Sequence, residues 1–352
     1  MHIRSRILIV IKYVAYSMGA LLYTSQLVAA QNTNVSGQLT RIIYAIHDHG
    51  VIKIDYDAYL CRYPQDYING NSRNKFKFSS IYTDEILHDD LYWFGYPDIR
   101  TVNQTNHISE LGFDNGFIII TNDGKLVITL DYIRIHDRYL DLVNRAFFQS
   151  FRSNFVDKFR EYYHTEPGIW DLLIAMADLV YHFPYHLPEN YMIIPNKGTI
   201  FTEGLYSPLR VLIEKKGDCD SKNLLFGVLF TLALQEFGLS EDYGLILAAQ
   251  HKKREPGHAA FFLRGGDLEG SMPYFRVDTS KNRLTMHDPD HQWFVKGEFF
   301  SIWDVTGTYQ PPTYWIPFNT MTDLKDFELV FLGGRTMSPK DRYQYFTWKW
   351  RK

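Results

Sequence analysis

One of the two cysteines lies where a nucleophile would be placed. Cys219 belongs to the polar stretch 215–223, which contains Gly217 and passes directly into the apolar run 224–234. That run predicts a long helix with Cys219 in its first turn. The first turn of a helix carries unpaired N–H groups and the positive end of the peptide dipole, so it favours a thiolate over a thiol. We therefore interpret Cys219 as a nucleophile, since a cysteine that only fills a core would more often lie among the leucines.

A histidine base and a carboxylate that orients it follow in the sequence. A thiolate nucleophile needs both, because the base moves the proton and the carboxylate holds the imidazole. His258 lies at the entrance of the predicted strand 257–263, and Asp278 lies near the end of the predicted strand 273–279. Adjacent antiparallel strands would bring His258 and Asp278 side by side beneath the start of the Cys219 helix. The three residues therefore predict a Cys-His-Asp triad.

Two other assignments of these residues remain open. Cys219, His258 and Asp278 are all residue types that bind zinc, although the cysteine here is preceded by an aspartate and not by a second ligand of a zinc pair. His251 is a rival to His258 as the base. It lies in the basic loop 250–256, where neighbouring positive charge disfavours an imidazolium. We prefer His258 because it opens a predicted strand.

The remaining candidate ligands do not predict a metal site. Histidine and aspartate cluster at 47–49 and 287–291, but neither cluster has a helical spacing that places ligands on one face, and the sequence has no Cys-x-x-Cys pair. We expect no metal and no cofactor. Cys61 follows the apolar residues 58–60, and we expect a free core cysteine, because pairing it with Cys219 would silence the nucleophile.

The candidate triad lies within a larger sequence pattern. The chain resembles the Cys-His-Asp core of the transglutaminase-like superfamily in three places: Gly217-Asp218-Cys219-Asp220-Ser221-Lys222 before an apolar helix, Gly257-His258-Ala259, and Val277-Asp278-Thr279. The closer likeness is to bacterial transglutaminase-like cysteine-peptidase domains. The likeness covers about residues 165–280. It includes a helix at 170–180 followed by Phe183-Pro184-Tyr185, and a short helical lead-in at 207–212.

The resemblance implies a papain-like α+β core, in which a catalytic helix packs on an antiparallel sheet. It also implies acyl transfer at an amide bond of a protein or peptide substrate, through Cys219, His258 and Asp278. The backbone N–H of Cys219 would contribute to the oxyanion hole, with Tyr185 as a second donor. Water would complete proteolysis or amide hydrolysis, which we favour, whereas an amine would complete transamidation. The alternative is a non-catalytic exported binding module that retains the fold.

Residues 1–30 are typical of an export signal. Basic residues among the first six precede an apolar run that begins at Ile7, and small residues at 28–30 precede a polar mature start at Gln31. We therefore expect a periplasmic or secreted protein with no stable membrane span after cleavage. The alternative is an uncleaved anchor through residues 7–30, because its part from Tyr13 to Ala30 is almost long enough to cross a bilayer.

Charge and length narrow the remaining possibilities. The formal net charge of −3 gives no indication of a nucleic-acid partner, and two cysteines in 352 residues are too few for a disulfide-stapled protein. The length allows two domains of ordinary size. We predict a signal at 1–30, a mixed α/β accessory region at 31–160, a catalytic domain at 161–306 and a C-terminal extension at 307–352 that packs on it. The oligomeric state stays open.

Periodicity gives the expected elements of these regions. In the accessory region we predict a helix at 39–46, a strand at 51–56, a loop-rich segment at 62–109, a hairpin at 117–130 and a helix at 138–155. In the catalytic domain we predict a helix at 169–180 and strands at 243–249, 257–263 and 273–279, with 292–295 and 299–305 extending the sheet.

Overall fold

A computed structural model describes much of the chain from Val51 onwards. The described residues are 51–63, 66, 74–94, 118–120, 126–128, 132–188, 191–194, 198–201, 205–250, 258–264, 275–278, 283–286, 293–295, 298–303, 305–306, 324–334 and 342–347. Contacts divide the chain into units 1–43 and 44–352, and all described residues belong to the second. The predicted signal at 1–30 and the predicted helix at 39–46 therefore lie outside the described residues. Within the described ranges, no helix is long and apolar enough to cross a membrane.

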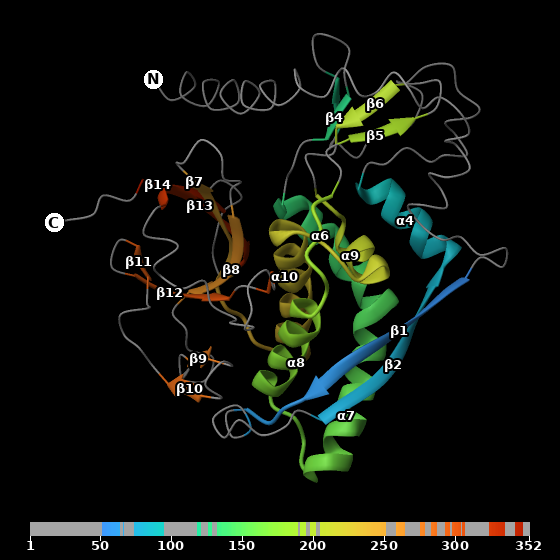
Figure 1. The fold of residues 1–352 in the computed structure, drawn as a ribbon, viewed down its shortest axis with the longest axis vertical. Helices are drawn as coiled ribbons and strands as arrows, with labels where there is room; N and C mark the ends of the chain where they lie inside the picture. Colours follow the sequence, from blue (N-terminus) through green and yellow to red (C-terminus); the bar gives the residue numbers. More distant parts are fainter. Residues whose placement is uncertain are drawn as a thin grey trace. The chain divides into compact units, whose positions relative to one another are not determined.

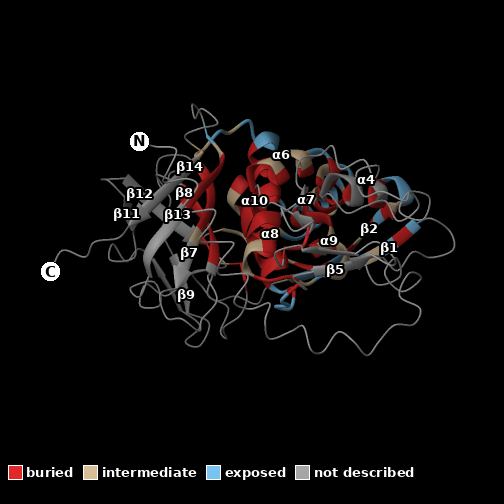
Figure 2. Cartoon of the chain, turned by 90° about the horizontal axis from the view of Figure 1, so that it is seen from above, coloured by how far each residue is buried: buried red, intermediate tan, exposed pale blue. Residues whose placement is uncertain are grey.

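The helix α10 (Cys219–Glu236) is buried over most of its length. Asp218 caps its start, because its side chain accepts a hydrogen bond from the N–H of Ser221 at 3.2 Å. All residues from Ser221 to Leu234 are buried, and the helix is red along most of its length in Figure 2. These features confirm the predicted long apolar helix with Cys219 in its first turn.

Several further helical elements contact α10: α6 (Tyr132–Val143), the π-helical turn η3 (Asn144–Phe148), α8 (Ile169–Tyr181) and α9 (Pro208–Glu214). The helix α4 (Asp84–Phe94) packs on α6, and α7 (Gln149–Tyr163) continues the chain from η3. The predicted helix at 138–155 is part of the continuous run from α6 to α7, and α8 confirms the predicted helix at 169–180. The start of α9 has a side-chain cap at Ser207, which accepts from the N–H of Arg210 at 3.0 Å.

A six-stranded antiparallel sheet lies against α10 (Figure 1). Its order is β11-β12-β8-β7-β13-β14. The strands are β7 (Tyr243–Gln250), β8 (His258–Arg264), β11 (Trp293–Val295), β12 (Glu298–Trp303), β13 (Leu324–Gly333) and β14 (Tyr343–Thr347). The predicted strands at 243–249 and 257–263 are confirmed as the neighbours β7 and β8. The strands β11 and β12 also extend the sheet as predicted.

Aromatic side chains join α10 to this sheet. The ring of Phe261 on β8 lies 5.0 Å from Phe226 and 4.8 Å from Phe230, centroid to centroid. Phe230 also contacts Tyr243 on β7 at 4.9 Å. Edge-to-face and tilted pairs at these distances are favourable in a buried core. They fix how the Cys219 helix lies on the strand that begins with His258.

A long antiparallel two-stranded ribbon packs against α7, α8 and η3. It consists of β1 (Val51–Leu60) and β2 (Asn74–Thr83), and alternate residues of both strands are buried. Tyr56 and Phe78 on its inner face contact Phe147 at 5.1 and 5.6 Å. The predicted strand at 51–56 is confirmed. The prediction of a loop-rich segment at 62–109 is wrong over 74–94, because the alternation of lysine and phenylalanine from Lys75 to Phe78 belongs to β2, and α4 follows directly.

Two smaller sheets complete the described strands. The first has the order β3-β4-β6-β5, with β3 (Ile118–Ile120), β4 (Leu126–Ile128), β5 (Tyr191–Ile194) and β6 (Gly198–Phe201). The antiparallel pair β3–β4 confirms the predicted hairpin at 117–130. The second contains β9 (Phe275–Asp278) and β10 (Arg283–Met286).

Packing crosses both of the predicted domain limits. The hydroxyl of Tyr56 on β1 donates to the carbonyl of Leu212 on α9 at 2.9 Å, so the 31–160 region shares a core with the 161–306 region. The strand β13, from the predicted C-terminal extension, pairs with β7 inside the sheet. In the described ranges the chain is an α+β structure of helices and antiparallel sheet, as predicted, while a functional division at residues 160 and 306 stays a prediction.

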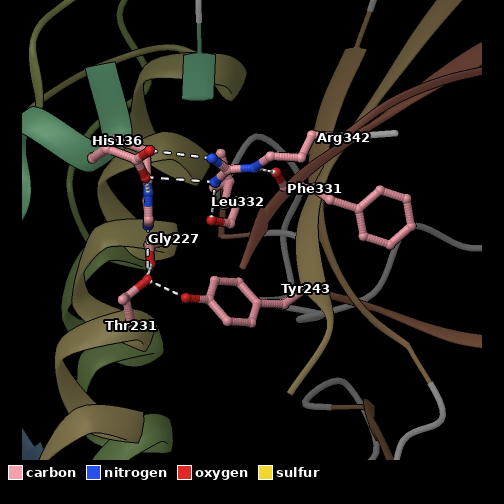
Figure 3. Close-up of polar contacts among 8 residues, drawn as sticks. His136, Gly227, Thr231, Tyr243, Phe331, Leu332 and Arg342 are labelled. Atoms are coloured by element: carbon pink, nitrogen blue, oxygen red, sulfur yellow. Dashed lines mark hydrogen bonds and ion pairs between the residues drawn. The ribbon is translucent and has the colours of Figure 1, made fainter. Parts of the chain in front are cut away.

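A buried polar network ties the far part of α10 to α6 and the sheet (Figure 3). His136 Nε2 lies 2.7 Å from the hydroxyl of Thr231, which is 2.5 Å from the hydroxyl of Tyr243. His136 Nδ1 lies 2.8 Å from a carboxylate oxygen of Asp137, and Arg342 donates to the other oxygen at 3.1 Å. The network therefore fixes the second half of α10, more than three turns beyond Cys219.

Candidate functional site

Cys219 is the first residue of α10 and is partly exposed, while Cys61 is buried, and neither forms a disulfide. This confirms the expectation that Cys61 is a core cysteine that is not paired with Cys219. The N–H groups of the first turn have no partner within a helix, so the start of α10 carries the positive end of the helix dipole. The hydroxyl of Tyr132 on α6 lies near the same turn, because it donates to Asp220 at 3.2 Å.

His258 begins β8, and the start of this strand adjoins the start of α10. The side-chain amide of Asn223 makes the connection: its Nδ2 donates to the carbonyl of Cys219 at 2.7 Å and to the carbonyl of Ala259 at 3.1 Å. One buried amide thus bridges the backbone of the candidate nucleophile and the backbone of the residue after the candidate base. The side chain of His258 lies outside the described part of the structure.

The side chain of Lys222 holds the same turn through buried hydrogen bonds. Its side chain has no exposed surface. The ammonium donates to the carbonyls of Phe183 and Thr306, each at 2.7 Å, and to the carbonyl of Tyr181 at 3.2 Å. A buried ammonium is costly unless it is fully hydrogen-bonded, and three carbonyl oxygens match its three donors. Lys222 therefore joins α10 to the end of α8 and to the segment that follows β12.

Tyr185 lies on an exposed segment that runs beside the cysteine motif. A parallel bridge joins Tyr185 to Gly217, with Gly217 N–H donating to Pro184 at 3.3 Å and His186 N–H donating to Gly217 at 3.0 Å. Gly217 itself is buried, and a Cβ there would lie 3.3 Å from side-chain carbons of Lys222, Ser221 and Val211. The close packing explains a glycine in the motif. The bridge also places the backbone of Tyr185 beside Gly217, which precedes Cys219 by two residues.

Two carboxyl groups flank Cys219. Asp218 Oδ1 and Asp220 Oδ1 both accept from the N–H of Ser221, at 3.2 and 3.0 Å. Burial, together with the charge of Asp220, raises the pKa of Asp218 to about 9. The hydrogen bonds from Ser221 lower the pKa of Asp218, but burial outweighs them. Burial therefore favours the protonated form of the carboxyl group that caps α10.

Asp278 is not on a strand next to β8. It ends β9, which pairs with β10, while both neighbours of β8 are β7 and β12. The expectation that adjacent strands carry His258 and Asp278 is thus wrong, because β12 occupies the position next to β8. The side chain of Asp278 lies outside the described residues, and its role as the orienting carboxylate stays a prediction.

The rival sites fall mainly outside the described ranges. This is so for His251 and for the clusters at 47–49 and 287–291. In the part of the chain that the structure does describe, no group of three or more histidine, cysteine, aspartate or glutamate side chains could hold a metal ion.

The sequence matches no protein-family model, no curated protein and no solved structure. The resemblance to transglutaminase-like proteins therefore rests on the motifs around Cys219, His258 and Asp278. Sequence reasoning missed the roles of Lys222 and Asn223. Their signal was present: two strongly polar residues directly precede an apolar run that has no polar face, so both had to be buried and bonded.

Proposed function

We propose that this chain is an exported, transglutaminase-like cysteine enzyme that transfers acyl groups from amide bonds, most simply to water. The proposal includes a papain-like core and a triad of Cys219, His258 and Asp278. The observation that supports it best is the amide of Asn223, which bonds to the carbonyls of Cys219 and Ala259. It brings the start of the cysteine helix and the start of the histidine strand together, as this chemistry requires.

The reaction would proceed in two steps, formation of a thioester and its cleavage. His258 takes the thiol proton, and the sulfur of Cys219 forms a bond to the amide carbon. The developing oxyanion accepts hydrogen bonds from the N–H of Cys219 and from Tyr185. The C–N bond then breaks, and His258 returns the proton to the leaving amine. Water or a second amine then attacks the thioester carbon and gives a proton to His258. The C–S bond breaks, and His258 returns the proton to the sulfur of Cys219, which releases the acid or the new amide.

An acyl-transfer assay tests this function. Protein beginning at Gln31 is incubated with a mixture of peptides, with and without a fluorescent primary amine, and the products are identified by mass spectrometry. Cleaved peptides indicate hydrolysis, and fluorescent peptides indicate transamidation. Cys219→Ser should abolish both products, because a hydroxyl is a poor substitute for a thiolate. His251→Ala is the matched control and should retain activity.

The same assay identifies a non-catalytic binding module. A wild-type protein that binds peptides but forms neither product, even at stoichiometric enzyme, would be the non-catalytic binding module. Export is tested separately by sequencing the N-terminus of the protein recovered from the producing cell. A start near Gln31 supports cleavage, whereas a start at Met1 with firm membrane retention establishes the anchor at 7–30.

A further inference from the structure

The start of α10 contains two consecutive buried polar residues, Lys222 and Asn223, and the side chains of both contact Thr306. Asn223 Nδ2 lies 3.3 Å from the hydroxyl of Thr306, and Lys222 Nζ donates to the carbonyl of the same residue at 2.7 Å. Lys222, Asn223 and Thr306 all have no exposed surface. We call these three residues the polar clamp. They link α10, the Phe183–Tyr185 segment, the start of β8 and the segment after β12.

We propose that Asn223 is a positioning residue that sets the separation of Cys219 and His258, with Lys222 holding the Tyr185 segment against the same turn. This inference rests on the proposed function, since it assigns the clamp to the same site. Asn223 does not touch substrate. It acts by holding the carbonyl of Cys219 and the carbonyl of Ala259, the residue after His258, at a fixed separation.

The orientation of the Asn223 amide is determined by its surroundings. Two carbonyl oxygens contact Nδ2, so turning the amide over would place an oxygen against both of them. In this orientation, Oδ1 is buried and has no donor among the described residues. A buried acceptor without a donor destabilises a fold. The three hydrogen bonds of Nδ2 stabilise the fold and Oδ1 opposes part of that gain, so the geometric role rests on the two carbonyls that Nδ2 holds together.

The chain offers a matched control on the same helix. Thr231 is also a buried polar residue of α10, and its hydroxyl bonds to Gly227 at 2.9 Å and to Tyr243. It belongs to the network of Figure 3, eight residues beyond Asn223 and away from the cysteine motif. Thr231→Val therefore removes buried hydrogen bonds from α10 without changing the contacts between α10 and the start of β8.

The test measures iodoacetamide alkylation of Cys219 at pH 7 in a double-mutant cycle. Asn223→Leu should slow alkylation about tenfold, since small misplacements of a base relative to its nucleophile have large effects on rate. In a His258→Ala background, Asn223→Leu should have no further effect, because it acts through that histidine. Thr231→Val should change the rate by no more than about twofold. Asn223→Ser provides a second variant, and unfolding curves confirm that each protein is folded.

Two results would overturn the proposal: multiplicative effects of Asn223→Leu and His258→Ala, or equal slowing by Thr231→Val. Failure of the proposed function is distinguishable, because wild-type Cys219 would then alkylate as an ordinary thiol with or without His258. In that case a crystal structure of Asn223→Leu decides the positioning role. A wider gap between the Cys219 and Ala259 carbonyl oxygens supports it, and an unchanged gap refutes it.

Discussion

Replacement of Lys222 by methionine tests how the start of α10 is held. Methionine has a similar length and no charge, so the change removes the ammonium and its three hydrogen bonds while largely preserving volume. The carbonyls of Tyr181, Phe183 and Thr306 then lose their donor in a fully buried place. The fold loses stability from these acceptors and gains stability because an ammonium no longer has to be buried.

The two effects can be compared in magnitude. A buried acceptor without a partner costs about 1–3 kcal/mol, so three of them cost about 3–9 kcal/mol. The desolvation penalty that disappears with the ammonium is several kcal/mol. All three carbonyls are held in a place that the substitution does not open to water, so we take the upper part of the first range and expect Lys222→Met to lower the free energy of unfolding by about 2–4 kcal/mol.

Urea denaturation measures this change, with Lys158→Met as the matched control. Lys158 is about half exposed and pairs with Glu161 at 2.6 Å on the surface of α7, so its replacement should change stability by less than about 0.5 kcal/mol. If the two variants have the same midpoint and slope, the three carbonyl contacts of Lys222 contribute nothing net, and the reasoning is refuted.

Three further predictions concern protonation and the proposed triad. Because the pKa of Asp218 is raised to about 9, the folded protein keeps a proton that the unfolded chain loses near pH 4. Stability should therefore fall as pH rises across this window, and in Asp218→Asn the urea midpoint should change less between pH 5 and 9. Burial lowers the pKa of His136 despite the hydrogen bond to Asp137, so stability should fall as pH drops below about 6.5, and His136→Gln should reduce that loss in the same assay. Asp278→Asn should lower turnover partially without weakening substrate binding, because it affects only the orientation of His258; a rate equal to wild type would remove Asp278 from the triad.

The local elements near the site were predictable because their signals are local. The glycine-containing turn before 224–234 predicted where α10 begins, and the apolar runs after Asp242 predicted β7 and β8. The position of β9 was not predictable in this way. Strand order depends on which non-local strand pairs with β8, and β12, some 40 residues further along, takes that place.

The segment at 62–109 shows a different kind of failure. Its polar composition suggested loops, although Phe76, Phe78 and Ser80 alternate with exposed residues in the period of a strand. The position of Lys222 and Asn223 before an apolar run indicated that both are buried, but the sequence did not indicate which groups they contact. Their acceptors belong to residues 181, 183, 259 and 306, which come together only when the helices and the sheet pack.

The pH dependence of Cys219 alkylation tests the central claim most directly. Protein is treated with iodoacetamide between pH 5 and 9, and the peptides containing Cys219 and Cys61 are quantified by mass spectrometry. We predict labelling of Cys219 well below about pH 8, loss of this low-pH labelling in His258→Ala, and labelling of the buried Cys61 only after unfolding. A Cys219 profile with an ordinary thiol midpoint near pH 8.5 that is unchanged in His258→Ala would contradict the claim that these residues form a nucleophile and its base.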